Sequence, residues 1–386
     1  MKIMYVVNSF GAGGAERHLL VLVGHMVSAG HSVLVVALTG VVSGGAKSIA
    51  DDFVSAGAQI AILDYSGARW LRDLGRWYAL RKTAIAWAPD IIHSHLPRAD
   101  LAASFVKRAL PNTVWVSTIH DAYIKGVYAG YWVFRWLGWN WRLADHILTV
   151  SGHARRWVMD ELRIPDAKTS IVYHGIASPP IESQPHNRSA NRGVRPLLVG
   201  CLSRFEQRKG IATLIKAMVS VCAKYPTARL VIAGSDPTGY ANRMRKLAEG
   251  LRVGHAVDIQ GFCDPPYNFL RQLDVFAFAS SSEGFGIVLL EAMATGLPIV
   301  ASNIYPLNYI VVDGTTGILA NPADPEAFSS AICDLLGNPE MAGRMGEAGK
   351  TRCSVHFSEK QMMGSITTLY EDLTGLANAG LMAKFQ

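Results

Sequence analysis

The sequence predicts an α/β protein built as two domains, each with its own parallel sheet. Apolar stretches of strand length alternate with helical patterns along most of the 386 residues, and this alternation is typical of βαβ units. A polar segment rich in proline, residues 178–193, interrupts the pattern near the middle and favours a linker. Composition changes at the same place: residues 1–178 hold 18 Lys+Arg against 12 Asp+Glu and all nine tryptophans, and the remainder is nearly neutral.

In the first domain, residues 1–178, short apolar runs bounded by polar, Gly or Pro residues predict the strands. These are expected near 3–7, 32–38, 59–63, 90–94, 113–118, 146–150 and 169–173. The linker is placed at residues 179–195.

The second domain, residues 196–360, repeats the alternation. Its strands are expected near 196–200, 229–233, 257–260, 275–279 and 298–301. From about residue 325 to 376 the pattern is helical, and residues 361–386 are expected to form a separate C-terminal helical segment.

The composition also limits the function classes. Five cysteines, an odd number without C-x-x-C spacing, argue against a disulfide framework or a zinc site. The chain opens on a predicted strand rather than a signal peptide, and no apolar run reaches the roughly 18 residues of a spanning helix. We therefore expect a cytoplasmic protein. No feature predicts a nucleic-acid partner.

The most informative segment follows the strand expected at 275–279. Glu283 is followed by Gly284, Phe285, Gly286 and Ile287, and an apolar helix then carries Glu291. Ligands of parallel sheets bind at the carboxyl ends of strands, and glycines let a ligand approach the amides at a helix start. A carboxylate beside such amides suits neutral hydroxyls better than phosphate. The segment predicts a ligand with both hydroxyls and phosphates, which describes a sugar nucleotide.

A second candidate loop follows the strand expected at 196–200. It contains Arg204, Arg208 and Lys209 before Gly210 and another apolar helix. Arg204 and Lys209 are placed to neutralise a diphosphate, and Arg208 is expected to be solvated. Because the chain has no D-x-D sequence and no clustered metal ligands, these cations are the expected substitute for a divalent metal.

A glycine loop follows the first strand. Gly13 and Gly14 lie in G-A-G-G-A-E-R, where Glu16 occupies the position at which the dinucleotide fingerprint requires its last glycine, so an oxidoreductase or epimerase reading is disfavoured. The alternative for this loop is a helix-capping turn without a ligand.

Residues 282–298, S-E-G-F-G-I-V-L-L-E-A-M-A-T-G-L-P, resemble the acid-pair signature of the retaining glycosyltransferases of family 4, which have the GT-B fold. The glycine loop resembles that family's G-G-A-E loop, and the Arg204 to Gly210 loop its diphosphate clamp. Taken alone, residues 282–298 could also be a glycine-rich turn of another α/β protein. The resemblance covers nearly the whole chain and implies two Rossmann-like domains that face each other across a central cleft.

The resemblance also implies roles for individual residues. Glu291 would bind the ribose hydroxyls, Arg204 and Lys209 the diphosphate, and Glu283 with the Gly284–Ile287 amides the sugar. His120, after the strand at 113–118, would contact the transferred sugar without acting as acid or base. Phe262 would lie beside the backbone that reads the nucleobase, and Gly13 and Gly14 would line the cleft. His93 and His95 alternate on a strand, but no third metal ligand lies near them in the sequence, so they are interpreted as structural or cleft-lining.

These roles imply a retaining, metal-independent hexosyltransferase that uses a UDP- or GDP-sugar. In such enzymes the C-terminal domain binds the donor, the N-terminal domain holds the acceptor, and the last helix crosses back to the N-terminal domain. The alternatives are a transferase acting on a soluble sugar, such as a sucrose- or glycogen-making enzyme, and a non-catalytic sugar-nucleotide-binding protein.

The acceptor is expected to be lipid-linked, with the first domain docked on the inner face of the cytoplasmic membrane. In the stretch 69–82, Arg69, Arg72 and Arg76 share one helical stripe, and Trp70 and Trp77 stand one heptad apart beside it. Basic and aromatic residues arranged in this way are typical of a helix in a membrane interface. The alternative is a helix packed on its own sheet with a solvated basic face.

Overall fold

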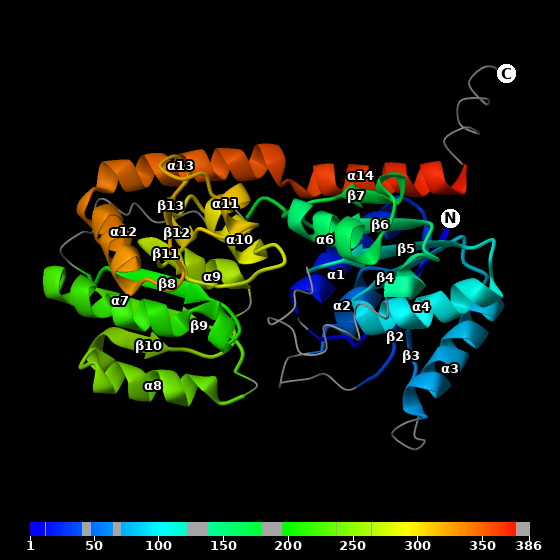
Figure 1. The fold of residues 1–386 in the computed structure, drawn as a ribbon, viewed down its shortest axis with the longest axis horizontal. Helices are drawn as coiled ribbons and strands as arrows, with labels where there is room; N and C mark the ends of the chain where they lie inside the picture. Colours follow the sequence, from blue (N-terminus) through cyan, green and yellow to red (C-terminus); the bar gives the residue numbers. More distant parts are fainter. Residues whose placement is uncertain are drawn as a thin grey trace. The chain divides into compact units, whose positions relative to one another are not determined.

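The structure is a computed structural model and describes residues 1–11, 13–40, 48–64, 71–121, 138–179, 195–236, 238–263 and 265–375. The chain forms two compact units (Figure 1). The first unit consists of Met1–His174 together with Gln361–Gln386, and the second of Gly175–Lys360.

The first unit alternates strands and helices, as the sequence predicts. Its strands are β1 (Lys2–Val7), β2 (Ser32–Ala37), β3 (Gln59–Ile62), β4 (Ile91–His95), β5 (Val114–Ile119), β6 (His146–Thr149) and β7 (Thr169–Ile171). Its helices are α1 (Gly14–Ser28), α2 (Ala50–Ser55), α3 (Arg72–Trp87), α4 (Pro97–Ala109), α6 (Gly152–Leu162) and most of α14 (Glu359–Thr374), and a 3₁₀ turn, η2 (Asp166–Lys168), precedes β7. All the strand pairs in this sheet are parallel, in the order β3-β2-β1-β4-β5-β6-β7.

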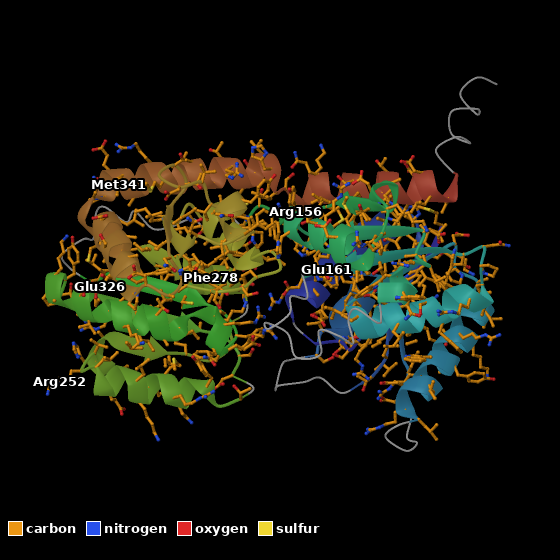
Figure 2. All side chains as sticks on the ribbon, viewed as in Figure 1. Arg156, Glu161, Arg252, Phe278, Glu326 and Met341 are labelled. Atoms are coloured by element: carbon orange, nitrogen blue, oxygen red, sulfur yellow. The ribbon has the colours of Figure 1, made fainter. Side chains whose placement is uncertain are left out.

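The second unit has a parallel sheet of its own, in the order β10-β9-β8-β11-β12-β13. Its strands are β8 (Leu198–Leu202), β9 (Arg229–Ala233), β10 (Val257–Ile259), β11 (Val275–Phe278), β12 (Ile299–Ser302) and β13 (Ile318–Ala320). Its helices are α7 (Ile211–Lys224), α8 (Tyr240–Gly250), α9 (Pro266–Leu270), α10 (Ile287–Ala294), α11 (Leu307–Ile310), α12 (Pro325–Gly337) and α13 (Pro339–His356), and its 3₁₀ turns are η4 (Gln207–Lys209) and η5 (Gly254–Ala256). In Figure 2, Phe278 marks β11 in the interior of this unit, and Glu326 and Met341 mark α12 and α13.

The predicted strands are confirmed within two residues at each end. The sequence reading missed β13, a strand of three residues that follows Gly317. Its run Ile-Leu-Ala is too short to show a period, and only its pairing with β12 identifies it as part of the sheet.

Helices near the end of the chain begin where the sequence carries strong start signals. The Asp324 side chain accepts hydrogen bonds from the amides of Glu326 and Ala327 before α12. The Asn338 side chain accepts one from the amide of Met341 before α13. In both helices a proline follows the capping residue, at a position where its missing N–H has no helical partner to lose.

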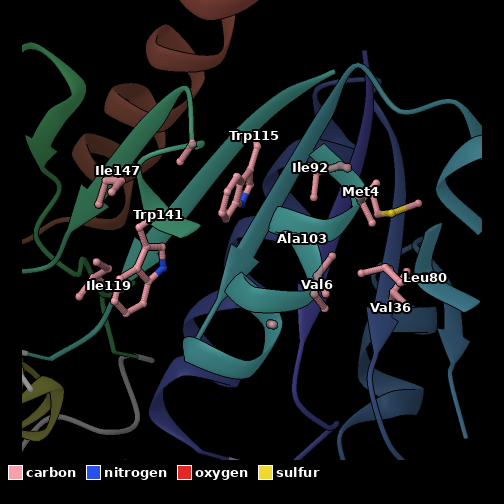
Figure 3. Close-up of a cluster of buried hydrophobic side chains, with 14 of the residues drawn as sticks. Met4, Val6, Val36, Leu80, Ile92, Ala103, Trp115, Ile119, Trp141 and Ile147 are labelled. Atoms are coloured by element: carbon pink, nitrogen blue, oxygen red, sulfur yellow. The ribbon is translucent and has the colours of Figure 1, made fainter. Parts of the chain in front are cut away.

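The core of the first unit lies on both faces of its sheet because side chains of a strand alternate between faces. Met4 and Val6 of β1 pack with residues of α3, α4 and α6, together with Trp115 and Trp141 (Figure 3). On the other face, Tyr5 and its neighbours on β1 pack with α1, α2 and α14. Helix α14 contributes Met362, Met363, Ile366 and Tyr370 to this second cluster. Helix α14 is therefore part of the same core as strand β1.

Three aspartates at the amino ends of strands have structural partners. Asp90 accepts a hydrogen bond from the Lys2 amide at 2.7 Å, Asp145 from the Trp115 amide at 2.7 Å, and Asp274 from the Leu198 amide at 2.8 Å. Asp274 also forms an ion pair with Arg195 at 2.7 Å. These acids join neighbouring strands at the edge opposite the one where ligands bind, so they belong to the fold rather than to a site.

Each sheet reverses its strand order at one point. In the first unit, β1 lies between β2 and β4, and in the second, β8 lies between β9 and β11. The loops that follow β1 and β4, and those that follow β8 and β11, consequently flank the two crevices at which open α/β sheets bind ligands. Among the described residues, no helix has both the length and the hydropathy needed to cross a membrane.

Candidate functional site

In the second unit, the loops after β8 and β11 bring together Lys209 and Glu283. The Lys209 Nζ atom lies 2.5 Å from Glu283 Oε1, and the two side chains are only 10% and 9% exposed. Lys209 also lies over the ring of Phe278, 5.6 Å from its centroid. The sequence reading assigned the two residues to one site from separate motifs, and the structure brings them into contact.

Gly210 makes this contact possible. Its φ is +67°, and a Cβ atom at this position would lie 1.9 Å from the carbonyl oxygen of Ala279. No other residue type fits without moving one loop away from the other. The glycine next to Lys209 therefore has a structural reason, which is the close approach of the two loop backbones.

Arg204 and Arg208 differ in how they are held. The Arg204 side chain is 57% exposed and pairs with Glu206 at 3.1 Å. Arg208 pairs with the same carboxylate and donates to the carbonyl oxygen of Ser282 at 3.0 Å. The expectation that Arg208 is solvated was wrong: its guanidinium links the two loops, and its own carbonyl oxygen accepts from the Ser281 amide at 2.8 Å. Sequence reasoning missed this residue because the spacing of Arg208 and Ser282 gives no sign of their contact.

Helix α10 begins directly after the glycine segment. Gly286 is its N-terminal cap with φ at +104°, a backbone conformation that favours glycine. Phe285 turns its side chain into the core, where its ring lies 6.0 Å from the ring of Phe357, so only its backbone can reach a ligand. The partly exposed Gly284 and Ile287 share this loop and the first turn of α10. The backbone geometry fits an amide-lined site at a helix start.

Glu291 lies on α10 and Phe262 in the loop after β10. Burial raises the pKa of Tyr267, and the negative charge of nearby Glu291 raises it further. Phe262 is nearly half exposed, and the carbonyl oxygen of the preceding Gly261 accepts from the Gly234 amide at 3.1 Å. The loop after β10 is thus tied to the loop after β9, on the other side of β8 from Glu283.

In the first unit, Gly13 and Gly14 follow β1 at the point where the strand order reverses. Gly13 caps α1, its carbonyl oxygen accepts from the Arg17 amide at 3.0 Å, and both glycines are exposed. A Cβ atom on Gly13 would lie 2.5 Å from an oxygen of Glu16. The loop leaves the backbone open to a ligand.

His120 belongs to a cluster of five histidines from different parts of the first unit, which we call the histidine cluster. Its members are His18 on α1, His93 and His95 on β4, His120 after β5 and His174 after β7. His95 Nδ1 lies 3.0 Å from His120 Nε2, and His174 Nδ1 lies 3.0 Å from His18 Nδ1. The His120 and His174 rings stack with centroids 5.6 Å apart. His93 and His95 were interpreted as structural or cleft-lining. The structure adds that His95 contacts His120 directly.

Burial keeps these rings neutral. It lowers the pKa of His18 to about 4 and, together with the repulsion that a protonated His18 would exert, that of His120 to about 3. Burial and neighbouring histidines also hold the pKa values of His93, His95 and His174 well below the ordinary value. His93 bonds to the hydroxyls of Tyr370 at 2.5 Å and Thr118 at 2.7 Å. Across the described parts of both units, no three metal-ligating side chains are placed to hold an ion.

The side of helix α3 that is exposed to solvent differs from the one that the sequence predicted. Arg76 is 11% exposed in its side chain and pairs with Asp73 at 3.2 Å. Trp77 packs against the core, with its ring 6.3 Å from that of Phe105. Arg72 is partly exposed, whereas Arg69 and Trp70 lie outside the described residues. The exposed side of α3, which we call the α3 face, consists of Leu74, Tyr78, Arg81, Lys82 and Ile85.

Comparison with known proteins extends these observations. A family model described as Glycosyltransferase Family 4 matches residues 12–178, and one described as Glycosyl transferases group 1 matches residues 183–352. The phosphatidyl-myo-inositol mannosyltransferase of Mycobacterium leprae is 28% identical over 342 residues, which is 87% of this chain and 87% of the relative. Glycogen synthase of Mycobacterium tuberculosis is 26% identical over 394 residues, covering 93% and 91%.

Solved structures share the fold. HepE of Anabaena, crystallised with UDP, superposes with a TM-score of 0.79 at 18% identity, covering 96% of this chain and all of that one. Sucrose-phosphate synthase of Thermosynechococcus elongatus gives a TM-score of 0.80 at 21% identity over 97% of this chain and 100% of its own.

Proposed function

The chain belongs to glycosyltransferase family 4, with the GT-B fold, and from this premise we propose that it moves a hexosyl unit from a nucleotide diphosphate sugar to a hydroxyl group with retention of configuration. The observation that carries the proposal is the contact of Lys209 with Glu283 at the carboxyl ends of β8 and β11. A cation and an acid at one point suit a substrate that has phosphate on one side and sugar hydroxyls on the other.

In the proposed complex, the second unit binds the donor. Lys209 and Arg204 neutralise the diphosphate, whose negative charge grows as the bond to the sugar breaks. Glu283 and the Gly284–Ile287 amides hold the sugar, and Glu291 accepts hydrogen bonds from the ribose hydroxyls. Phe262 marks the loop whose backbone reads the base. A UDP- or GDP-sugar fits these roles, and HepE of Anabaena has been crystallised with UDP.

The first unit is proposed to hold the acceptor, with Gly13, Gly14 and His120 beside the transferred sugar. The leaving phosphate takes the proton from the incoming hydroxyl on the same face of the sugar, so no residue of the chain has to act as nucleophile. The protein then contributes positioning and charge stabilisation. The neutral state of His120 supports its role as a hydrogen-bonding group rather than a charged acid.

Release of free nucleotide from a panel of UDP- and GDP-sugars tests the donor assignment, because slow hydrolysis reports the donor even without the acceptor. One sugar nucleotide should stand out, and turnover should persist in EDTA because Arg204 and Lys209 take the place of a metal. A full loss in EDTA that magnesium or manganese restores would refute the metal-independent scheme. Binding of a sugar nucleotide without any turnover would favour the non-catalytic alternative.

For the acceptor we propose a lipid-linked saccharide or lipid on the inner face of the cytoplasmic membrane, reached through the α3 face. Leu74, Tyr78 and Ile85 are each more than half exposed, and Arg81 and Lys82 are exposed beside them. Apolar residues flanked by cations suit an anionic lipid surface, to which each cation contributes about 1 kcal/mol. The M. leprae relative is named for a phosphatidyl-myo-inositol substrate. The glycogen and sucrose-phosphate synthases among the similar proteins support the second candidate, a soluble sugar acceptor.

Flotation with liposomes separates the two acceptor classes. Binding should require anionic lipid and weaken as salt rises from about 0.1 to about 0.5 M. An Arg81→Ser/Lys82→Ser variant should lose binding. An Arg243→Ser/Lys246→Ser variant on α8 of the second unit, which removes the same charge from exposed positions, should keep it. If the wild-type protein ignores anionic liposomes at low salt, a soluble acceptor becomes the better proposal.

A further inference from the structure

The hydrogen bond between His95 and His120 has two possible directions, and they give His120 opposite properties. The atoms involved are His95 Nδ1 and His120 Nε2, 3.0 Å apart. Both rings are neutral because burial lowers both pKa values, so each ring carries one proton. Which nitrogen of a histidine is protonated follows from the hydrogen bond that the other nitrogen makes.

The surroundings of His95 distinguish the two directions. His95 is fully buried at the end of β4, and its Nε2 atom has no hydrogen-bond partner among the described residues. If that nitrogen carried the proton, a buried N–H donor would have no acceptor, and such orphaned donors are rare in folded proteins. If Nδ1 carries the proton instead, that proton is used in the bond to His120, and only a lone pair is left at Nε2.

The rings around His95 do not alter this choice. The His93 ring lies 4.3 Å away, centroid to centroid, and its nitrogens are occupied by Tyr370 and Thr118. Tyr5 and His18 lie farther off, at 6.1 and 6.3 Å. Within the described part of the chain, no group donates a hydrogen bond to His95 Nε2 or accepts one from it.

We propose that His95 is a positioning residue that donates from Nδ1 to His120 Nε2 and thereby fixes His120 as the tautomer with its proton on Nδ1. The bond to His95 is the one hydrogen bond of the His120 ring within the described residues, and His120 keeps part of its surface exposed. The exposed side of His120 then offers a hydrogen-bond donor to a sugar hydroxyl. It offers no lone pair, so His120 cannot take a proton from the incoming hydroxyl.

This inference rests on the proposed function only for the identity of the ligand, and the tautomer can be measured without any substrate. The full chain labelled with ¹⁵N-histidine should show, at pH 7.5, long-range ¹H–¹⁵N correlations typical of an Nδ1–H ring for His120. The signal is assigned from its absence in a His120→Asn variant. A wild-type spectrum with an Nε2–H ring at His120 would overturn the proposal.

Two substitutions at His95 complete the test. His95→Asn keeps an amide donor near the place of Nδ1 and should preserve the His120 tautomer, whereas His95→Leu removes the donor and should give a mixture of tautomers. With an active donor sugar, kcat should fall about tenfold or more in His95→Leu, with little change in KM for the donor, and recover in His95→Asn. An unchanged His120 spectrum in His95→Leu would refute the positioning role. A spectrum that responds as expected, in a protein that turns over no sugar nucleotide, would instead count against the proposed function.

The His120→Asn variant tests the donor role separately. Asparagine can donate a hydrogen bond but cannot act as a base at neutral pH. Turnover within about tenfold of wild type is expected if His120 only donates, since general base catalysis contributes roughly 10²–10⁴-fold. A loss near the upper end of that range would show that His120 takes a proton, contrary to the proposed tautomer.

Discussion

Lys209 and Glu283 illustrate how one pair of side chains can serve both the fold and the chemistry. Each is about nine-tenths buried, and the two charges neutralise each other across 2.5 Å. Removal of one partner leaves an uncompensated buried charge, which typically costs about 3–5 kcal/mol of stability. A single substitution therefore mixes a loss of stability with a loss of function.

A double-mutant cycle separates the two effects. Lys209→Met and Glu283→Gln should each lower the free energy of unfolding of the second unit, and the double variant should recover much of it because no charge is left unpaired. Transfer should fall at least about a hundredfold in all three proteins, since the group that faces the developing charge is missing. The five cysteines, all in the second unit, report its unfolding through their reactivity. A double variant with near wild-type turnover would remove the pair from the mechanism.

The close approach at Gly210 can be tested against Gly239, a glycine with a similar backbone conformation and no close neighbour. Gly239 has nearly the same φ, +71° against +67°, but a Cβ atom there meets nothing within 4 Å. Gly239→Ala should lower the free energy of unfolding by roughly 1–2 kcal/mol, the cost of a left-handed backbone. Gly210→Ala should cost more and should weaken nucleotide binding, because its Cβ atom forces the Lys209 loop away from β11. Equal effects of the two substitutions in denaturant titrations would contradict the close-approach argument.

Helix α14 (Glu359–Thr374) completes the first unit, although most of it comes after the whole second unit in the sequence. Its residues Met362, Met363, Ile366 and Tyr370 are buried with strand β1 and helix α1. The Tyr370 hydroxyl bonds to His93 at 2.5 Å and lies 3.3 Å from the Tyr5 hydroxyl. The helix therefore contributes both apolar area and a polar partner for the histidine cluster.

Tyr370→Phe tests this contribution while keeping the shape of the side chain. The buried His93 Nδ1 atom loses its partner, which should lower the stability of the first unit by about 1–3 kcal/mol. All nine tryptophans belong to the first 178 residues, so intrinsic fluorescence follows that unit, and cysteine reactivity follows the other. Only the fluorescence transition should move. Thr368→Ala, on the exposed side of the same helix, should change stability by no more than about 0.5 kcal/mol, and an equal effect of both variants would contradict the role of the Tyr370 hydroxyl.

The two units should respond differently to acid. The histidine cluster has pKa values lowered by burial, to about 4 for His18 and about 3 for His120, whereas unfolded histidines titrate near 6.5. A histidine whose pKa is lowered in the folded state stabilises the fold at pH values above its pKa in the unfolded chain. This stability is lost as the pH falls below that pKa. Asp100 acts in the opposite sense, because burial raises its pKa to about 7 and the folded state then binds its proton first. Five histidines outnumber one carboxyl group, so acid should destabilise the first unit.

We predict that the fluorescence transition of the first unit weakens by at least about 1.4 kcal/mol per pH unit between pH 6 and pH 5, the value for one extra proton bound by the unfolded state. The cysteine-monitored transition of the second unit should change less. Asp100→Asn removes the opposing group and should make the loss in acid steeper. A first unit that is equally stable at pH 7.5 and pH 5 would show that the histidines are protonated in the folded state.

Much of the fold follows from local patterns in the sequence. Alternating apolar runs identify the strands, because the hydrophobic period depends on neighbouring residues alone. The helical pattern predicted from about residue 325 agrees with the start of α12 after Asp324. Sequence-adjacent motifs also point to the loops after β8 and β11 as candidate ligand loops. The sequence analysis missed strand β13 because a run of three residues has no measurable hydrophobic period. Only its pairing with β12 makes it part of the sheet.

Contacts between distant segments could not be predicted from the sequence. Arg208 was expected in solvent, but it donates to Ser282, a residue 74 positions away. Likewise, nothing in the spacing of His18, His93, His95, His120 and His174 predicts a cluster, since the strands that carry or precede them meet only when the sheet forms. On α3, periodicity grouped Arg76 with a basic stripe, and packing paired it with Asp73 and turned Trp77 towards the core. Most of the strands, the family resemblance and the motif residues could be predicted from the sequence, because they depend on local order. Which side chains are buried and paired could be learned only from the structure, because burial and pairing depend on neighbours that the linear order does not reveal.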